Sequence, residues 1–487
     1  MLLLNKSPLL ALTAALFLSG CTLGPDFASP TAPGAQSYAM KGDAAPKSIR
    51  LTAAPAAGPW WTALASPALD TTIKLALAGS PTLDEADATL AQSRALLGAA
   101  QGQALPQVSL SAGAARERAN LQAAGFSSFG GISISNPTFP LYSLGGAVSY
   151  DLDLVGGQKR RIESAAAQAE AQAWRSEAAY LTLTTNVALQ AVTVATLRAQ
   201  IAALESIIAD DQKTVDLVTR AADLGGMTRS ATLSAQTQLE VDRAQLPALQ
   251  GQLASARHAL ALLAGRAPSA WSPPDFDMAD FAVNAAVPLE LPSTLVRKRP
   301  DILAAEADLH AATAEIGVAT ANLYPDIKLT ASLTQGAQML GNIFSYDSSA
   351  WSLAAGITAP LFDGGTLEAQ QQAAVAAAQA ADARYRQTVL KAFVEVADAL
   401  QAIATDDATI AAHKRTEAQS AESLRLARVG LQEGGGTLLD VLDAQRAHSD
   451  AIAARIRAEG QRLADIVRLF AATGADWRVA GVRPQGA

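Results

Sequence analysis

Two very long stretches without helix-breaking residues constrain what this chain can fold into. Neither Gln158–Leu224 nor Thr366–Val429 contains a glycine or a proline. Glycine and proline destabilise a helix interior by roughly 1 and 3 kcal/mol. Their absence predicts two unbroken helices, each on the order of 100 Å long. The charges along the first stretch, among them Arg160 and Asp210, argue against its spanning a membrane.

The N-terminus has the pattern of an exported lipoprotein. Lys6 and the apolar run Leu9–Leu18 precede Leu18-Ser19-Gly20-Cys21, a small-residue cleavage site that ends in the only cysteine of the chain. This predicts a signal peptide over residues 1–20 and acylation of Cys21, in preference to a plain signal peptide with a chance cysteine. Thr22, in place of an aspartate, predicts sorting to the outer membrane.

Composition narrows the class of protein. Half of the residues are apolar but only 5% are aromatic, which suits helices packed closely on helices. Loss of Lys6 takes the net charge from −8 to −9, which argues against a nucleic-acid partner. The chain has no phosphate-binding loop, GxGxxG, HExxH or cysteine pair, so no enzyme, cofactor or metal site is predicted. The histidines stand singly and are expected to be surface or packing residues: His258, His310, His413 and His448.

An internal repeat organises the chain. A single offset aligns Pro81 with Pro300 and Gly98 with Gly317, and a slightly smaller offset later pairs Gly225 with Gly434. The predicted organisation is a lipid-anchored extended arm (21–61), a first repeat (62–265), a proline-rich linker (266–299), a second repeat (300–474) and a C-terminal tail (475–487).

Each half carries two segments in which apolar residues alternate with small or polar ones, at 107–114, 143–154, 326–334 and 351–361. Such alternation suits lipid-facing strands of a membrane barrel, but half-buried strands of a soluble sandwich give the same pattern. The predicted sorting to the outer membrane favours the barrel. In that case the loops 117–141 and 335–350 are expected to lie outside the cell. Four strands cannot close a barrel, so two chains with eight strands or three chains with twelve are required.

Heptad spacing marks the long helices and predicts coiled-coil packing. The apolar positions are Leu197, Ile201, Leu204, Ile208, Val215 and Val218 in the first, and Val389, Phe393, Val396, Leu400, Ile403 and Ile410 in the second. Helices over Ser230–Ala264 and Leu438–Ala472 are expected to return antiparallel, and a short helix is expected over Leu64–Ala78.

One acidic pair stands out as a candidate site. Asp440 and Asp443 follow the second glycine-rich turn and share one helix face. Their counterparts in the first half are Ala231 and Ser234, so the carboxylates belong to one half only. In a trimer they would form two stacked acidic rings at a constriction. Acidic residues in the first turns of a helix are also favourable with its dipole, and spacing leaves both interpretations open.

At these residues the chain resembles the TolC-like outer membrane efflux family, and within it the OprM/NodT-type lipoproteins. The motifs are Cys21–Phe27, Trp60-Trp61, Arg299–Ile302 and Leu439–Gln445. The resemblance implies a mainly α fold with a membrane β-barrel, in which a homotrimer forms a twelve-stranded barrel continued by a periplasmic helical barrel. It also implies a palmitate-bearing anchor in the outer membrane and no enzymatic activity.

The family's partners are a periplasmic adaptor and an inner-membrane pump, here expected to be of the RND type. Asp440 and Asp443 match the aspartates of the family's periplasmic gate. Gly436 departs from relatives that carry an arginine there, which predicts a looser tip.

The predicted function is a passive exit duct for drugs or other small toxic molecules, as in multidrug resistance. The alternatives are a duct for secreted polypeptides and a lipid-anchored coiled-coil scaffold without a pore.

Overall fold

The structure is a computed structural model that describes residues 22–31, 34–35, 37–52, 59–120, 128–129, 132–133, 136–281, 286–289 and 292–474. The predicted signal peptide, Cys21 and the tail from residue 475 lie outside these residues. The chain divides into two compact units, and each draws on both halves of the sequence. The sheet unit comprises the described parts of Met1–Ser29, Gln92–Ala171 and Glu306–Arg384. The helical unit comprises those of Pro30–Ala91, Gln172–Ala305 and Tyr385–Ala487.

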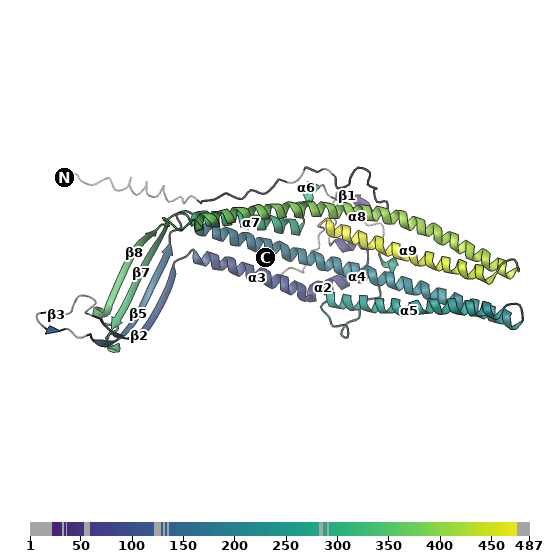
Figure 1. Cartoon of the computed structure of the whole chain (residues 1–487), viewed down its shortest axis with the longest axis horizontal. Coiled ribbons are helices and arrows are strands. Elements are labelled where there is room, and N and C mark those ends of the chain that lie inside the picture. The colour runs from purple at the N-terminus through teal and green to yellow at the C-terminus, as the bar shows by residue number, and fades with distance from the viewer. Residues whose placement is uncertain are drawn as a thin grey trace. The chain divides into compact units, whose positions relative to one another are not determined.

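The sheet unit holds four long antiparallel strands, as the alternating segments predicted. They are β2 (Gln107–Arg118), β5 (Thr138–Asp151), β7 (Asp326–Ala337) and β8 (Ser349–Thr358), in the order β2-β5-β7-β8 (Figure 1). Among the described strands, β2 and β8 each have one neighbour in this sheet, so the sheet has two open edges.

The register of the sheet separates an apolar face from a small and polar one. Val108, Val148, Ala331 and Leu353 stand opposite one another across all four strands. The neighbouring row, Ser109, Ala147, Ser332 and Ser352, is small and mostly hydroxylated. Val108 and Leu353 are 77% and 78% exposed in the single chain, so the described part of the chain leaves the apolar face uncovered.

Two strands end earlier than their alternation predicted. β5 stops at Asp151 rather than Leu154, because Asp153 has a φ of 27° and its N–H binds the Asp151 carboxylate at 3.2 Å. β8 stops at Thr358, short of Leu361, just before Pro360. The backbone conformation just after β5 and β8 therefore sets where these strands end, although the side-chain alternation continues past that point.

The loops at the other end of the strands are shorter than expected, because β2, β5 and β7 extend into them. The first loop carries the short antiparallel pair β3 (Ser128–Phe129) and β4 (Ile132–Ser133). The second carries two single-turn 3₁₀ helices, η3 (Leu340–Asn342) and η4 (Tyr346–Ser348).

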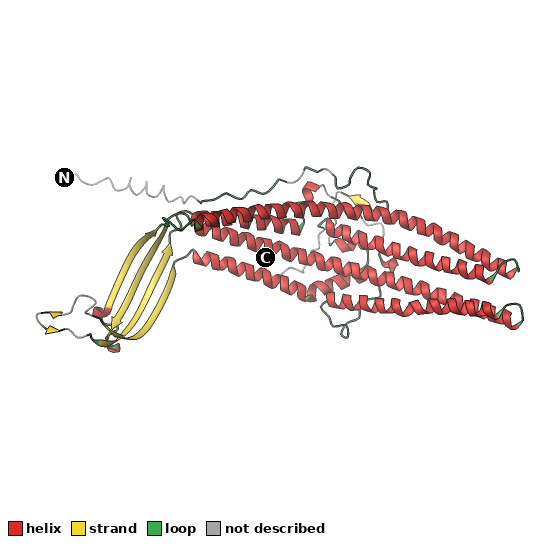
Figure 2. Ribbon diagram, viewed as in Figure 1, coloured by secondary structure: helices red, strands yellow, loops and turns green. Residues whose placement is uncertain are grey.

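Long helices make up most of the rest (Figure 2). α4 (Gly157–Asp223) and α8 (Thr366–Gln432) are each 67 residues long, and α8 continues through Gly430 beyond its expected end. α5 (Arg229–Leu263) and α9 (Leu438–Ala472) follow the two turns, and α3 (Pro81–Gln103) and α7 (Pro300–Ala321) precede the strand pairs. The two halves thus run through the same order of elements.

The heptad positions face the core of the helical unit. Most of them are at most 8% exposed: Leu197, Leu204, Val215 and Val218 in α4, and Val389, Val396, Leu400, Ile403 and Ile410 in α8. Gly460 brings α9 close to α4, because a Cβ there would lie 2.2 Å from the Thr196 Oγ1. Heptad spacing and small residues together produce the close helix packing that the composition predicted.

Trp60 and Trp61 seal one part of this core. They begin the 3₁₀ helix η1 (Trp60–Leu64), and both are at most 1% exposed. The Trp60 ring stacks on Phe470 with centroids 5.5 Å apart, and its Nε1 donates to the Thr184 hydroxyl at 3.3 Å. The following helix, α2 (Pro67–Gly79), begins later than the predicted Leu64, because η1 takes up its first turn.

The arm, which was predicted to be extended, and the proline-rich linker contain short regular elements and make contacts distant in the sequence. β1 (Arg50–Thr52) in the arm pairs in parallel with β6 (Ala286–Pro288) in the linker. The backbone N–H groups of Lys47 and Ser48 both donate to the Asp407 carboxylate, at 2.8 and 2.9 Å. The linker also holds η2 (Met278–Asp280) and the single-turn helix α6 (Pro292–Leu295). The first two contacts join residues far apart in the sequence, which local patterns do not reveal.

Candidate channel gate and supporting sites

The two hairpin turns of the helical unit are built alike. Gly225 and Gly434 follow α4 and α8 in the left-handed region, with φ of 77° and 80°, which favours glycine. The next N–H groups bind carbonyls of the helix end, from Gly226 to Ala221 at 2.8 Å and from Gly435 to Gly430 at 2.9 Å. The turns therefore satisfy the last carbonyls of each long helix and reverse the chain.

Asp440 lies in the first turn of α9, where it completes a helix cap. Thr437 is the N-cap, and its hydroxyl accepts the Asp440 N–H at 3.2 Å. The Asp440 carboxylate in turn accepts the Thr437 N–H at 2.8 Å and its hydroxyl at 2.7 Å. These hydrogen bonds lower the pKa of Asp440, so the exposed carboxylate is charged at neutral pH.

The matching turn of the first half shows that this cap does not require an acid. Thr228 caps α5 in the same way, accepting the Ala231 N–H at 3.2 Å, without a carboxylate at the equivalent position. Asp443, one helical turn beyond Asp440, takes no part in the cap. It is 63% exposed and lies 4.0 Å from the Arg446 guanidinium. Capping therefore accounts for one acid of the pair and leaves Asp443 unexplained.

Gly436 stands in the turn just before this cap. Its N–H donates to the Gly430 carbonyl at 2.9 Å, and a Cβ at position 436 would meet the Gly430 carbonyl carbon and the Leu431 nitrogen at 3.1 Å. The turn has thus closed around a residue without a side chain. An arginine here would require the turn to move away from α8.

A buried arginine ties the start of α7 to two other helices. Arg299 is 7% exposed, and its guanidinium binds Asp301 at 2.7 and 3.0 Å, Glu395 of α8 at 2.7 Å and the Ala472 carbonyl of α9 at 2.9 Å. Sequence reasoning noted Arg299 only as part of a family motif. Its role depends on residues 96 and 173 positions away, so no local signal reveals it.

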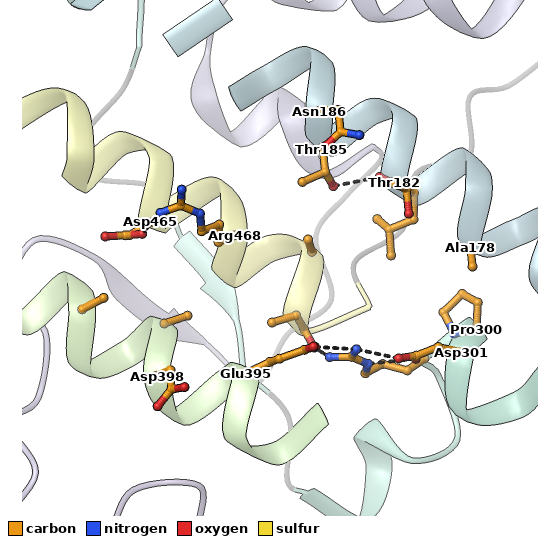
Figure 3. Close-up of a pocket in the computed structure, with 16 residues that line it drawn as sticks. Ala178, Thr182, Thr185, Asn186, Pro300, Asp301, Glu395, Asp398, Asp465 and Arg468 are labelled. Atoms are coloured by element: carbon orange, nitrogen blue, oxygen red, sulfur yellow. Dashed lines mark hydrogen bonds and ion pairs between the residues drawn. The ribbon is translucent and has the colours of Figure 1, made fainter. Parts of the chain in front are cut away.

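This cluster borders a pocket of about 520 Å³ in the helical unit. In Figure 3, Asp301 and Glu395 lie together at one side, while Asp465 and Arg468 extend from α9. Small side chains such as Ala178 form much of the remaining wall. No chemistry is apparent in this arrangement, and we regard the Arg299 cluster as structural.

Replacing Arg299 by alanine is expected to destabilise the protein by about 2 to 3 kcal/mol, because two carboxylates and a carbonyl lose their shared partner. Arg299→Lys should recover only part of this, since an ammonium cannot bind all three groups in one plane. Thermal unfolding followed by circular dichroism measures the effect. Arg243→Ala is the matched control, because its 2.7 Å pair with Glu240 is exposed. Equal melting temperatures for the alanine variants would contradict the assignment.

In the sheet unit, Arg160 of α4 holds the first described residues of the arm. It is 3% exposed, and it donates to the Leu23 carbonyl at 3.0 Å and to the Asp26 carboxylate at 2.7 Å. Phe27 stacks on His310 of α7 with centroids 4.4 Å apart. The His310 Nε2 also lies 3.0 Å from a carboxylate oxygen of Glu163, so the ring is held by stacking and by a polar contact. The first described residues of the arm, Leu23–Phe27, are therefore held on the sheet unit by defined contacts.

Glycine makes this contact close. Gly24 has a φ of 88°, and a Cβ there would lie 2.5 Å from the Gly317 Cα. Gly317 is also one of the glycines that the repeat aligned, and it faces the Leu23 carbonyl. The arm thus approaches α7 at a point where both segments carry a glycine and neither has a side chain.

Among the described residues, no three His, Cys, Asp or Glu side chains gather in a way that could hold a metal ion. One described helix, α4, is long and apolar enough to cross a membrane by length and composition alone. Its central apolar residues, including Val187, Val194 and Leu197, are buried in the core of the helical unit, which accounts for their hydropathy. This helix is therefore not assigned to the membrane.

A four-stranded sheet with an uncovered apolar face, on a chain with two long helical hairpins, is the arrangement expected of an outer-membrane channel subunit. The family model described as "Outer membrane efflux protein" matches residues 72–266 and 291–475, and the chain belongs to this family. It is an outer-membrane channel component of a tripartite efflux system with a long periplasmic helical extension, which sequence reasoning predicted.

Relatives support this assignment along nearly the whole chain. The pyoverdine export outer membrane protein OpmQ of Pseudomonas aeruginosa is 30% identical over 421 residues, covering 86% of this chain and 87% of the relative. The cation efflux system protein CusC of Escherichia coli O6:H1 is 28% identical, covering 98% and 100%. The outer-membrane channel OprN superposes with a TM-score of 0.83 at 28% identity, covering 94% of this chain and all of that one.

Proposed function

We propose that three copies of this chain form a passive duct for small molecules. The observation that carries this is the pair of open edges on β2 and β8. Unpaired backbone groups are not tolerated in the hydrocarbon of a membrane, so each edge requires a strand from another copy. Three copies give twelve strands, which leave a passage, whereas the eight strands of two copies would be filled by side chains.

The partners proposed for this duct are a periplasmic adaptor and an inner-membrane pump of the RND type, which supplies the energy. The names of the relatives include an exporter of pyoverdine and a cation efflux protein, so membership in the family does not fix the substrate. The absence of any recognised catalytic motif in the sequence is in keeping with a passive role. A pore-free scaffold is disfavoured, because it would leave the apolar face of the sheet exposed to water.

We further propose that Cys21 is acylated and that residues 1–20 are removed. The sequence around Cys21 and the docking of Leu23–Phe27 on the sheet unit support this, since the docked arm would hold the anchor beside the sheet. Intact-mass measurement of the purified protein decides the matter. A free Cys21 thiol, or a retained leader, would refute it.

The function is tested by purifying the full-length protein from outer membranes. We expect a trimer that resists SDS unless heated, and single-channel currents after insertion into planar bilayers. Deletion of the gene should increase susceptibility to small toxic compounds and leave secreted proteins unchanged. The opposite pattern in the deletion strain would favour the polypeptide duct, and a monomer without channel activity would overturn the proposal.

The proposed gate is the acidic pair of α9. Asp440 and Asp443 are exposed and lie next to a hairpin turn, and the first half of the chain has no equivalent acids. In a trimer, each position would contribute three carboxylates around the axis. Such rings would attract divalent cations and restrict the passage of anions.

A further inference from the structure

Two aspartates meet inside the first helical hairpin. Asp211 of α4 and Asp242 of α5 are 3% and 6% exposed, and their carboxyl groups lie within hydrogen-bonding reach of each other. The Asp211 Oδ1 accepts the Gln445 amide of α9, while its Oδ2 is buried and has no hydrogen-bond partner in the structure. Two carboxylate oxygens cannot bind each other without a proton. The contact is therefore incomplete in its ionised form.

The surroundings of the pair favour a proton on Asp211. Both oxygens of Asp242 already accept amide N–H groups, from Gln238 at 2.8 Å and from Gln245 at 3.1 Å. Both oxygens of Asp242 are thus occupied as hydrogen-bond acceptors. A protonated Asp211 would donate its O–H to this carboxylate, which would satisfy the oxygen that is left without a partner.

None of the described charged side chains packed around Asp211 and Asp242 forms an ion pair with either carboxyl group in the structure. Asp210, on the same helix, adds negative charge, and Arg428 of α8 lies 3.8 Å from Asp210. Arg446 of α9 donates to the Gln238 side chain rather than to either acid. Burial, then Asp242 and Asp210, raise the pKa of Asp211 to about 7, although Arg428 lowers it.

The second hairpin contains the same arrangement. Asp406 of α8 lies within hydrogen-bonding reach of Asp465 of α9, which is 6% exposed. Asp465 accepts the Gln461 amide at 3.0 Å and an N–H of Arg468, while the Oδ2 of Asp406 is buried without a partner.

The charged groups around this second pair are Asp407, Arg462 and Arg468. Arg462 lies 3.6 Å from Asp407, and Arg468 pairs with Asp465. Burial, then Asp465, raise the pKa of Asp406 to about 7, while Arg462 lowers it and Asp407 raises it. Neither arginine binds the Oδ2 of Asp406.

The two pairs share a sequence pattern that the internal repeat does not produce. Each uses an Asp-Asp doublet on the long helix and a Gln-x-x-x-Asp on the returning helix. Asp211 lies two heptads before Gly225, and Asp406 lies four heptads before Gly434. The two pairs therefore lie at different distances from their turns. Asp211 occupies a core position of the heptad series, whereas Asp406 lies one residue before the core position that Asp407 occupies. The same set of residue types thus occurs once in each hairpin, closer to the turn in the first hairpin than in the second.

We propose that each aspartate pair holds one shared proton, and that this proton fastens the long helix of its hairpin to the returning helix. Release gives the carboxylate and a proton that passes to solvent, and two neighbouring like charges then repel across the hairpin. Because both raised pKa values exceed the ordinary value of 3.8, the stabilisation is fully present below about pH 4 and is lost as the pH rises through about 7. The hairpins are therefore fastened in acid and loosened in mildly alkaline solution.

The test uses the full-length protein and the variant Asp211→Asn/Asp406→Asn. Asparagine imitates the protonated acid, because its amide can donate to the partner carboxylate while its oxygen still accepts. Infrared difference spectra between pH 5 and pH 8 should show the C=O band of protonated carboxylic acids in the wild type and a clearly weaker band in the variant. The melting temperature of the variant should fall less than that of the wild type over the same range.

Asp216→Asn, at an exposed position on α4, is the matched control and should behave as the wild type does. Identical infrared bands and identical pH shifts in the wild type and the double variant would overturn the shared protons. In bilayers, the wild-type conductance should rise between pH 6 and pH 8 and that of the variant should not. This last measurement rests on the proposed channel, whereas the infrared and melting measurements do not, so the two proposals can fail separately.

Discussion

An alanine at position 265 should destabilise the protein strongly. Gly265 follows α5 in the left-handed region with a φ of 66°, and its N–H closes the helix on the Leu262 carbonyl at 3.0 Å. A Cβ there would lie 1.8 Å from the Gly79 carbonyl oxygen. That obstacle is backbone, so no side-chain rotation relieves it.

Two effects add at this position. The left-handed conformation costs an L-residue roughly 1 to 2 kcal/mol, and forcing extra volume into a packed site typically costs about 1 to 3 kcal/mol more. We expect Gly265→Ala to lose about 3 kcal/mol or more, which is a large part of the stability of a typical domain. Thermal unfolding followed by circular dichroism, together with the yield of SDS-resistant trimer, measures the loss.

Gly251→Ala provides the control for this substitution. Gly251 lies in the interior of the same helix, is exposed and has no heavy atom within 4 Å of the added Cβ. There alanine should be neutral or stabilise the helix by up to about 1 kcal/mol. If both variants unfolded together, the close approach of Gly265 to Gly79 would not matter to the fold.

Removing the charges of the proposed gate should have the largest effect on conduction. Asp440→Asn/Asp443→Asn keeps a side-chain oxygen to accept the Thr437 N–H, so the cap of α9 persists while both acidic rings vanish. One unit charge at 4 Å from another contributes about 1 kcal/mol even in water. We therefore expect block by divalent cations to weaken by about tenfold or more, with a higher open conductance in planar bilayers.

The controls separate the gate from the cap. Asp450→Asn removes an exposed acid from the same helix farther from the turn and should leave the block unchanged. Asp440→Ala alone should also lower the melting temperature, because it removes the hydrogen-bond acceptor of the cap. Undiminished block in the double asparagine variant would refute the gate at Asp440 and Asp443.

Patterns that repeat along the chain predicted most of the architecture. The breaker-free stretches located α4 and α8 within a few residues, and alternation located all four long strands. Prediction failed at element ends, where Asp153 and Pro360 decide by backbone geometry. It also missed the β1–β6 pair, since strands this short carry no period to recognise.

The candidate site was only half readable from the sequence. Spacing placed Asp440 and Asp443 on one helix face, but the structure was needed to show that Asp440 completes a cap while Asp443 does not. The Asp-Asp doublets stand in the sequence, but no local pattern marked them as a site. Their partners, Asp242 and Asp465, could be assigned only once the hairpins were built.

By itself, the sequence predicted an export signal, and it determined the two halves and the lengths and faces of helices and strands. These properties depend on neighbours a few residues apart, and periodicity reports them directly. Only the tertiary structure decided the Arg299 cluster, the docking of the arm on Arg160 and the two aspartate pairs. Each of these needs burial and a partner distant in the chain, because a buried charge is defined by what surrounds it and not by its place in the sequence.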